Sequence, residues 1–316
     1  MDDQFMHALK TPPRPEFSNR LRERLAGTAD PAAPESSSRP RWLLAAAVVL
    51  GVGLFALPSV RTSAQAFLNL FRVVNFTAVP VNVERINGLA QNGLDLPTLI
   101  GQQVEVLEDA GAPQVVSTLD EAAAATRLPL KLPAVVPPGL IMSRIEVAGP
   151  KAARVKGDTR KLQDVMDALG ITDLTIPDGL DGQLATLRTF ASARVTYANG
   201  NTEVSFTQAR SPEVTMPAGI DLAHLGEIGL RIVGLEAAEA HTLAEAIDWR
   251  GTLIVPVPAG VSSFRQVDIR GNRGLLVVSK QRREMKGVLW SAGGVVYGIT
   301  GPLADDRLLQ MAVSVQ

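Results

Sequence analysis

The sequence contains no cysteine, only three histidines and few aromatic residues. Without cysteine the chain can form no disulfide, no thiol nucleophile, no iron–sulfur cluster and no cysteine-based zinc site. We expect the widely separated His224 and His241 to be surface or capped residues, not metal ligands. Aromatic residues make up 4% of the chain, so the core must be built from leucine, valine, isoleucine and alanine. The net charge of -1 provides no basic field that would hold nucleic acid, and we expect no such partner.

The common catalytic and nucleotide-binding motifs are missing as well. There is no glycine-rich phosphate loop after a strand, no Walker A lysine, no His-Glu-x-x-His and no Gly-x-Ser-x-Gly. Asp305 and Asp306 form an adjacent carboxylate pair, but acidic residues are also favoured in the first turn of a helix, and we interpret them in that way. We therefore predict that the protein is not an enzyme and uses no metal or other cofactor.

One long apolar run, residues 42–60, stands out from the rest of the chain. It carries no charged side chain, and its 19 residues correspond to about 28 Å of helix, close to the thickness of a bilayer core. A buried core helix is one alternative. A signal peptide cleaved at Ala64-Gln65-Ala66 is another, but the preceding 41 residues are longer and more neutral than the start of a signal peptide. We predict a single, uncleaved transmembrane helix.

The basic residues near this run predict its orientation. Positively charged residues are retained on the cytoplasmic side of a membrane, and acidic residues count for little. Within twenty residues of the run, four basic residues precede it and two follow it. We therefore expect residues 1–41 to be a short cytoplasmic tail and the residues after the run to lie outside the cytoplasmic membrane. The basic residues counted before the run are Arg22, Arg24, Arg39 and Arg41, and those after it are Arg61 and Arg72.

The tail itself contains one short amphipathic pattern. Pro15 suits a first helical position and Gly27 suits a C-terminal cap, and a Pro/Ser linker follows at residues 28–40. Three apolar residues recur every four positions along this helix and have nothing in the tail to pack on. The helix can dock in a groove of a cytoplasmic partner, lie on the inner membrane face or remain a solvated tail. The candidate partner-binding residues are Phe17, Leu21 and Leu25, together with Arg20, Arg22 and Arg24.

The remaining chain predicts an α+β fold, an antiparallel sheet of hairpins with packed helices. We divide it into a juxtamembrane part, residues 61–116, and an extracytoplasmic α+β domain, residues 117–316. In the juxtamembrane part we expect a short helix at 63–73 and stalk or edge strands at 77–84 and 99–107. Prolines at 129, 133, 137 and 138 exclude a helix or a central strand over 128–139.

Turn and cap residues mark the elements of the outer domain. Thr118 and Glu121 form a capping box for a helix at 119–126. We expect Trp290 and Tyr297 to be core residues and the basic segment 280–286 to be a solvated turn, with contact to anionic lipid as the alternative. The predicted strand is 141–147, and the predicted helices are 159–169 closed by Gly170, 222–228, 237–247 and 303–313. The predicted hairpins are 193–206 turning at Asn199-Gly200, 265–279 turning near residues 271–274, and 288–300 turning at Gly293-Gly294.

Two stretches of the outer domain resemble a bacterial domain of unknown function. That domain forms the extracytoplasmic part of single-pass, membrane-anchored regulators similar to anti-sigma factors. The resemblance lies in the Glu-Ala helix and Leu-Pro segment of residues 117–139, and in the Trp strand, Gly turn, Tyr strand and Leu/Ala helix of residues 290–314. Residues 150–285 lie outside it. The chain departs from zinc-type anti-sigma domains in having no cysteine and in having a tail of only 41 residues.

The resemblance implies a location and a function. We expect a protein of the bacterial inner membrane that acts by protein binding, with a cytoplasmic sigma factor or co-regulator as the candidate partner of its tail. The alternative is a membrane-anchored envelope module whose outer domain binds lipid, lipoprotein or another envelope protein. An apolar groove open to solvent would favour the alternative.

Overall fold

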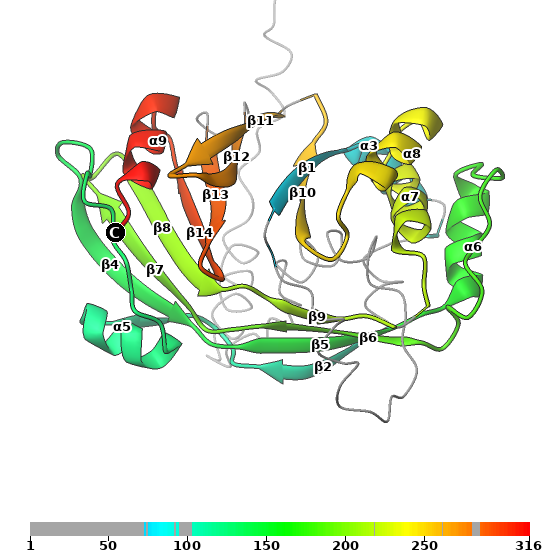
Figure 1. Ribbon diagram of the computed structural model, residues 1–316, viewed down its shortest axis with the longest axis horizontal. Helices are drawn as coiled ribbons and strands as arrows, with labels where there is room; N and C mark the ends of the chain where they lie inside the picture. The colour runs from blue at the N-terminus through cyan, green and yellow to red at the C-terminus, as the bar shows by residue number, and fades with distance from the viewer. Residues whose placement is uncertain are drawn as a thin grey trace, which may run out of the picture. The chain divides into compact units, whose positions relative to one another are not determined.

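The computed structural model describes residues 73, 75–91, 93–94, 103–217, 219–260, 262–279 and 285–316. The chain divides into two units, residues 1–41 and 42–316, and all of the described residues belong to the second. They form a mixed α/β structure with mostly antiparallel sheets, which agrees with the expected fold class (Figure 1). The expected transmembrane helix at 42–60 lies outside the described residues. Among those residues, no helix has the length and apolar character needed to cross a membrane.

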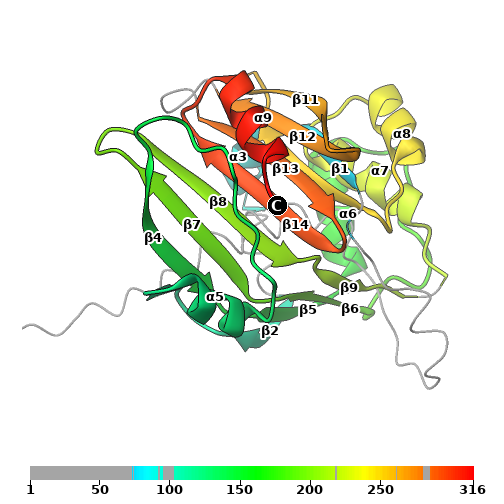
Figure 2. The same ribbon diagram turned by 60° about the vertical axis from the view of Figure 1, so that its left-hand side comes forward.

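An eight-stranded antiparallel sheet is the largest element of this unit (Figure 2). The turn at Gly293-Gly294 is as predicted, whereas Asn199-Gly200 begins a four-residue loop, residues 199–202, and does not form a two-residue turn. The strand order is β11 (Ser262–Ile269), β12 (Asn272–Ser279), β13 (Lys286–Ala292), β14 (Val295–Gly301), β8 (Glu203–Arg210), β7 (Ser192–Ala198), β4 (Ile141–Ala148) and β3 (Gln114–Val116).

The turn between β11 and β12 differs from the prediction. It consists of Arg270 and Gly271, both with positive φ, and not of residues 271–274. Two positive φ values in succession match the right-handed twist of the flanking strands. Gly274 lies inside β12, where a Cβ atom would meet the Leu289 carbonyl oxygen at 2.9 Å. Gly274 therefore serves close packing between strands and is not part of the turn.

A four-stranded antiparallel sheet continues from the first one through three short bends. Residues 149–150, 190–191 and 211–212 are the only ones between β4 and β5, between β6 and β7, and between β8 and β9, respectively. A Cβ atom on Gly149 would lie 2.3 Å from the Cβ of Ala110, so this bend requires glycine. The strand order is β2 (Val104–Asp109), β5 (Lys151–Lys156), β6 (Leu184–Thr189) and β9 (Glu213–Thr215). Of these strands, only part of β2 falls in a predicted strand, 99–107.

A parallel pair of strands packs on one face of the larger sheet. β1 (Asn75–Val81) pairs with β10 (Thr252–Pro258), and Phe76 and Val257 join Leu275 of β12 in a buried cluster. The strand predicted at 77–84 is confirmed up to Val81 only. Asn82 ends it, because its Oδ1 accepts the Arg85 N–H at 2.9 Å and caps α3 (Val83–Gln91).

The helices of the outer domain agree closely with the caps seen in the sequence. One half of the capping box is confirmed, since Thr118 Oγ1 accepts the Glu121 N–H at 3.1 Å, whereas the Glu121 carboxylate accepts from Ser117 N–H and not from Thr118 N–H. Gly170 has the expected positive φ, and residues 128–139 form neither a helix nor a central strand. The helices are α5 (Leu119–Thr126), α6 (Thr159–Ala168), α7 (Leu222–Ile232), α8 (Ala237–Ala246) and α9 (Asp305–Val313). Most of the helix predicted at 63–73 lies outside the described residues.

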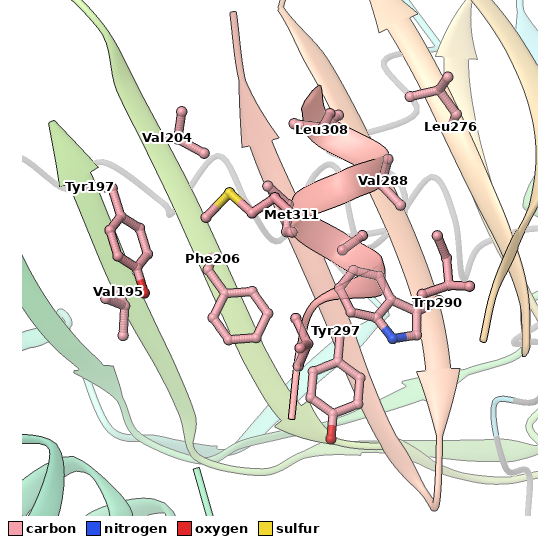
Figure 3. Packing of buried hydrophobic residues seen from close by; sticks show 14 of the residues in the cluster. Val195, Tyr197, Val204, Phe206, Leu276, Val288, Trp290, Tyr297, Leu308 and Met311 are labelled. Atoms are coloured by element: carbon pink, nitrogen blue, oxygen red, sulfur yellow. The ribbon is translucent and has the colours of Figure 1, made fainter. Parts of the chain in front are cut away.

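The main core lies between the larger sheet and α9 (Figure 3). Trp290 and Tyr297 are 3% and 5% exposed, which confirms their prediction as core residues. Their rings stack on one another with centroids 5.2 Å apart, and Phe206 lies beside both. Three of the described aromatic residues are thus gathered where the helix crosses the sheet. Leu308, Met311 and Ala312 of α9 cover this face and are themselves buried.

Candidate protein-binding surface

The outer edge of β11 is an open strand edge. Residues 263–266 are all exposed, and the aromatic side chain of Phe264 is 45% exposed. Among the described residues β12 is the only strand that pairs with β11, so β11 forms one margin of the larger sheet (Figure 2). An edge strand presents free N–H and C=O groups that another extended chain can bind.

Most of the other described edges are shielded in ways that β11 is not, the exception being residues 141–144 of β4, which β3 does not cover. β3 and β9 have only three residues each. β1 carries Pro80, and β10 carries Pro256 and Pro258, which cannot donate a hydrogen bond to a further strand. β2 places Glu105, Glu108 and Asp109 within six residues. Short length, proline and charge are the usual protections of a sheet edge, whereas β11 has eight residues and no proline.

Ion pairs join β11 and β13 to the start of α9. The Asp305 carboxylate lies 2.8 Å from Lys286 Nζ and 3.5 Å from the Arg265 guanidinium, so it joins α9 to β13 and β11. The hydrogen bond from Lys286, with a smaller contribution from Arg265, holds the pKa of Asp305 below its ordinary value despite an opposing desolvation effect. The position of Asp305 at the start of α9 confirms the interpretation made from the sequence. The neighbouring Arg270 donates to the Val315 carbonyl at 2.9 Å.

Each of the two described histidines contacts an oxygen atom of another residue. His241 Nδ1 lies 2.9 Å from the Glu227 carboxylate, and the His224 Nε2 contacts the Thr175 carbonyl oxygen at 2.5 Å. The side chain of His241 is 64% exposed, as a surface histidine would be. The hydrogen bond with Glu227 raises the pKa of His241. Within the described part of the chain, no group of three or more His, Asp or Glu residues could hold a metal ion.

The face that carries the aromatic residues is covered. Trp290, Tyr297 and Phe206 are buried under α9, and Ser314–Gln316 continue from the helix to pair with residues 132–134. A lipid chain could reach these rings only if α9 were displaced. Two other exposed apolar side chains, Ile141 at 70% and Val115 at 66%, belong to β4 and β3 at the opposite end of the sheet order.

The candidate residues of the tail lie outside the described residues. Phe17, Leu21 and Leu25, with Arg20, Arg22 and Arg24, therefore remain a sequence prediction. Most of the basic segment 280–286 also lies there, and only Met285 and Lys286 are described. The sequence analysis missed the β11 edge. The available signal was an alternating eight-residue stretch without proline, but the sequence does not show which strand lies outermost.

Comparison of the chain with protein-family models, with curated proteins and with solved structures finds no match.

Proposed function

We propose that the protein is a single-pass regulator of the bacterial inner membrane that acts by binding other proteins, in the manner of an anti-sigma factor. The observation that carries the proposal is the uncharged run 42–60, which separates a 41-residue tail from the larger folded unit. The tail has an apolar stripe for a cytoplasmic partner, a sigma factor or co-regulator. The outer unit has an open strand edge at β11. Binding on both sides of a membrane is what a transmembrane regulator requires.

The tail is the part through which the cytoplasmic partner would bind. Phe17, Leu21 and Leu25 lie on one stripe of a helix that begins at Pro15, and the arginines lie around them. A 13-residue helix is marginal alone in water, so its apolar stripe gains order only by docking. A charge placed in the middle of the stripe would have to be buried on docking, at a cost of several kcal/mol or about 10²-fold or more in affinity.

The experiment is an affinity pull-down from membranes with the full-length protein and with the Leu21→Asp variant. We expect Leu21→Asp to abolish capture of the cytoplasmic partner while the protein still fractionates with the membrane. Asn19→Asp is the matched control, because it adds the same charge to the opposite side of the helix. A version without residues 1–30 should behave like Leu21→Asp. Unchanged capture by Leu21→Asp would exclude the tail from the mechanism.

The alternative is a membrane-anchored envelope module whose tail has no specific role. The exposed edge of β11 favours a protein ligand in this case, because the aromatic face that could hold lipid or lipoprotein chains is covered by α9. The same pull-down separates the two functions. Recovery of identical envelope partners by the full-length protein and by the version without residues 1–30 would move the function to the outer domain.

A further inference from the structure

The turn between β11 and β12 determines which backbone groups of β11 face outward. Arg270 and Gly271 form a two-residue turn, so Ile269 and Asn272 are a hydrogen-bonded pair. Bonded and non-bonded pairs alternate along an antiparallel ladder. Val267 and Arg265 therefore direct their N–H and C=O groups to β12. Asp268, Gln266 and Phe264 direct theirs away from it, to the open side.

We propose that β11 pairs antiparallel with β11 of a second copy of this chain, around a twofold axis that passes through Val267. In this register Gln266 lies opposite the partner subunit's Asp268, and the symmetry repeats the pair. The Gln266 amide can donate to Asp268 Oδ2, since Asp268 Oδ1 already accepts from Gly271 N–H at 3.0 Å. Val267 lies opposite the partner subunit's Val267. Each of these cross-strand contacts is favourable.

The neighbouring registers are less favourable, which selects the axis at Val267. With the axis at Arg265, each arginine faces its own copy, and like charges directly opposite destabilise a pair of strands. With the axis at Gln266, the exposed ring of Phe264 faces the partner subunit's Asp268 carboxylate. Of these three axes, only the one at Val267 avoids both contacts and also gives the Gln266 side chain a hydrogen-bond partner.

The proposed contact between the two strands is small. Anchoring of both chains in one membrane would allow it to form. The two Gln266–Asp268 pairs bring four backbone hydrogen bonds between the copies. Each bond contributes about 1 kcal/mol, so the association is weak in dilute solution. Two chains held in the same bilayer meet at a much higher effective concentration. The inference rests on the membrane anchor of the proposed function, but it concerns the outer unit and requires no cytoplasmic partner.

Disulfide cross-linking tests the register directly, because the native chain has no cysteine. In the proposed pairing the two Val267 residues form a non-hydrogen-bonded pair with Cα atoms about 4.5 Å apart, which is within the disulfide range. The full-length Val267→Cys variant in membranes, oxidised with copper phenanthroline, should form a covalent dimer. Ser263→Cys is the matched control on the same face, because its two copies would lie about 27 Å apart along the strands.

We expect the dimeric fraction of Val267→Cys to exceed that of Ser263→Cys roughly tenfold. Equal cross-linking of the two variants, no dimer from Val267→Cys, or its cross-linking to a different protein would each overturn the proposal. A version without residues 1–30 should cross-link as the full-length chain does, even if the tail proves to have no partner.

Charge changes at Gln266 test the pairing without altering the backbone. In the Val267→Cys background, Gln266→Glu places a carboxylate opposite the partner subunit's Asp268 and should lower the dimeric fraction several-fold. Gln266→Lys places a cation there and should preserve or raise it. With the axis at Gln266 instead, both changes would set like charges opposite each other and lower the dimeric fraction. Loss of the dimer in Gln266→Lys would therefore refute the register.

Discussion

Replacing Gly226 of α7 by alanine should destabilise the protein, although alanine is the better helix former. Gly226 is buried within α7, where the helix faces Trp249. A Cβ atom at this position would lie 2.0 Å from Cζ2 of the indole ring. The ring cannot move without consequence, because Trp249 Nε1 donates a hydrogen bond to the Ala244 carbonyl of α8 at 2.8 Å. Gly226 is therefore required by the contact between α7 and the segment that follows α8.

The opposing effects can be compared from their usual magnitudes. Alanine gains about 1 kcal/mol over glycine in helix propensity. Forcing an extra methyl group into a packed core costs about 1–3 kcal/mol. Displacement of the indole also breaks its hydrogen bond, which costs about 1–3 kcal/mol more if a buried group stays unpaired. We expect a net loss of about 2 kcal/mol, which corresponds to a fall in Tm of roughly 4–8 °C for a unit of this size.

Thermal unfolding of the full chain in detergent, followed by circular dichroism, measures this change. Gly88→Ala in α3 is the matched control, because a Cβ atom there meets no described atom within 4 Å. It should raise the stability by up to about 1 kcal/mol, through the propensity gain alone. The two substitutions should thus shift Tm in opposite directions. A Tm for Gly226→Ala equal to or above that of the native protein would refute the packing argument.

Two further predictions concern the His241–Glu227 pair and the membrane topology. Glu227 raises the pKa of His241 in the folded state. The pair should therefore stabilise the protein fully below the pKa of an unfolded histidine, about 6.5. This stabilisation should disappear as the pH rises through the raised pKa of His241 in the folded state. The Tm difference between the native protein and Glu227→Gln should therefore shrink between pH 6 and pH 9, and a difference independent of pH would contradict this. In spheroplasts, a membrane-impermeant maleimide should label the Ser263→Cys variant but not Ser36→Cys, and the reverse pattern would contradict the predicted orientation.

The local signals in the sequence predict the helices and turns well. Thr118 caps α5, Gly170 ends α6, and Gly293-Gly294 turns the β13–β14 hairpin, as expected. Each of these features depends on a few neighbouring residues, which either accept hydrogen bonds from nearby backbone N–H groups or adopt the backbone angles that a turn requires. The end of β1 is misplaced because the cap at Asn82 comes inside an apolar alternation that continues to residue 83. A strand pattern and a helix cap overlap there, and the cap prevails.

Pairing between distant strands could not be predicted in this way. β1 and β10 are separated in sequence by all four strands of the smaller sheet and by four strands of the larger one, yet they form a parallel pair. The openness of β11 follows from the same long-range topology, since an edge is defined by the absence of a neighbour among the described strands. In β11 the side chains of Phe264, Arg265 and Gln266 are as compatible with a central strand as with an edge. The candidate surface thus becomes visible only when the strand order is known, whereas the tail helix is visible in the sequence because its stripe is local.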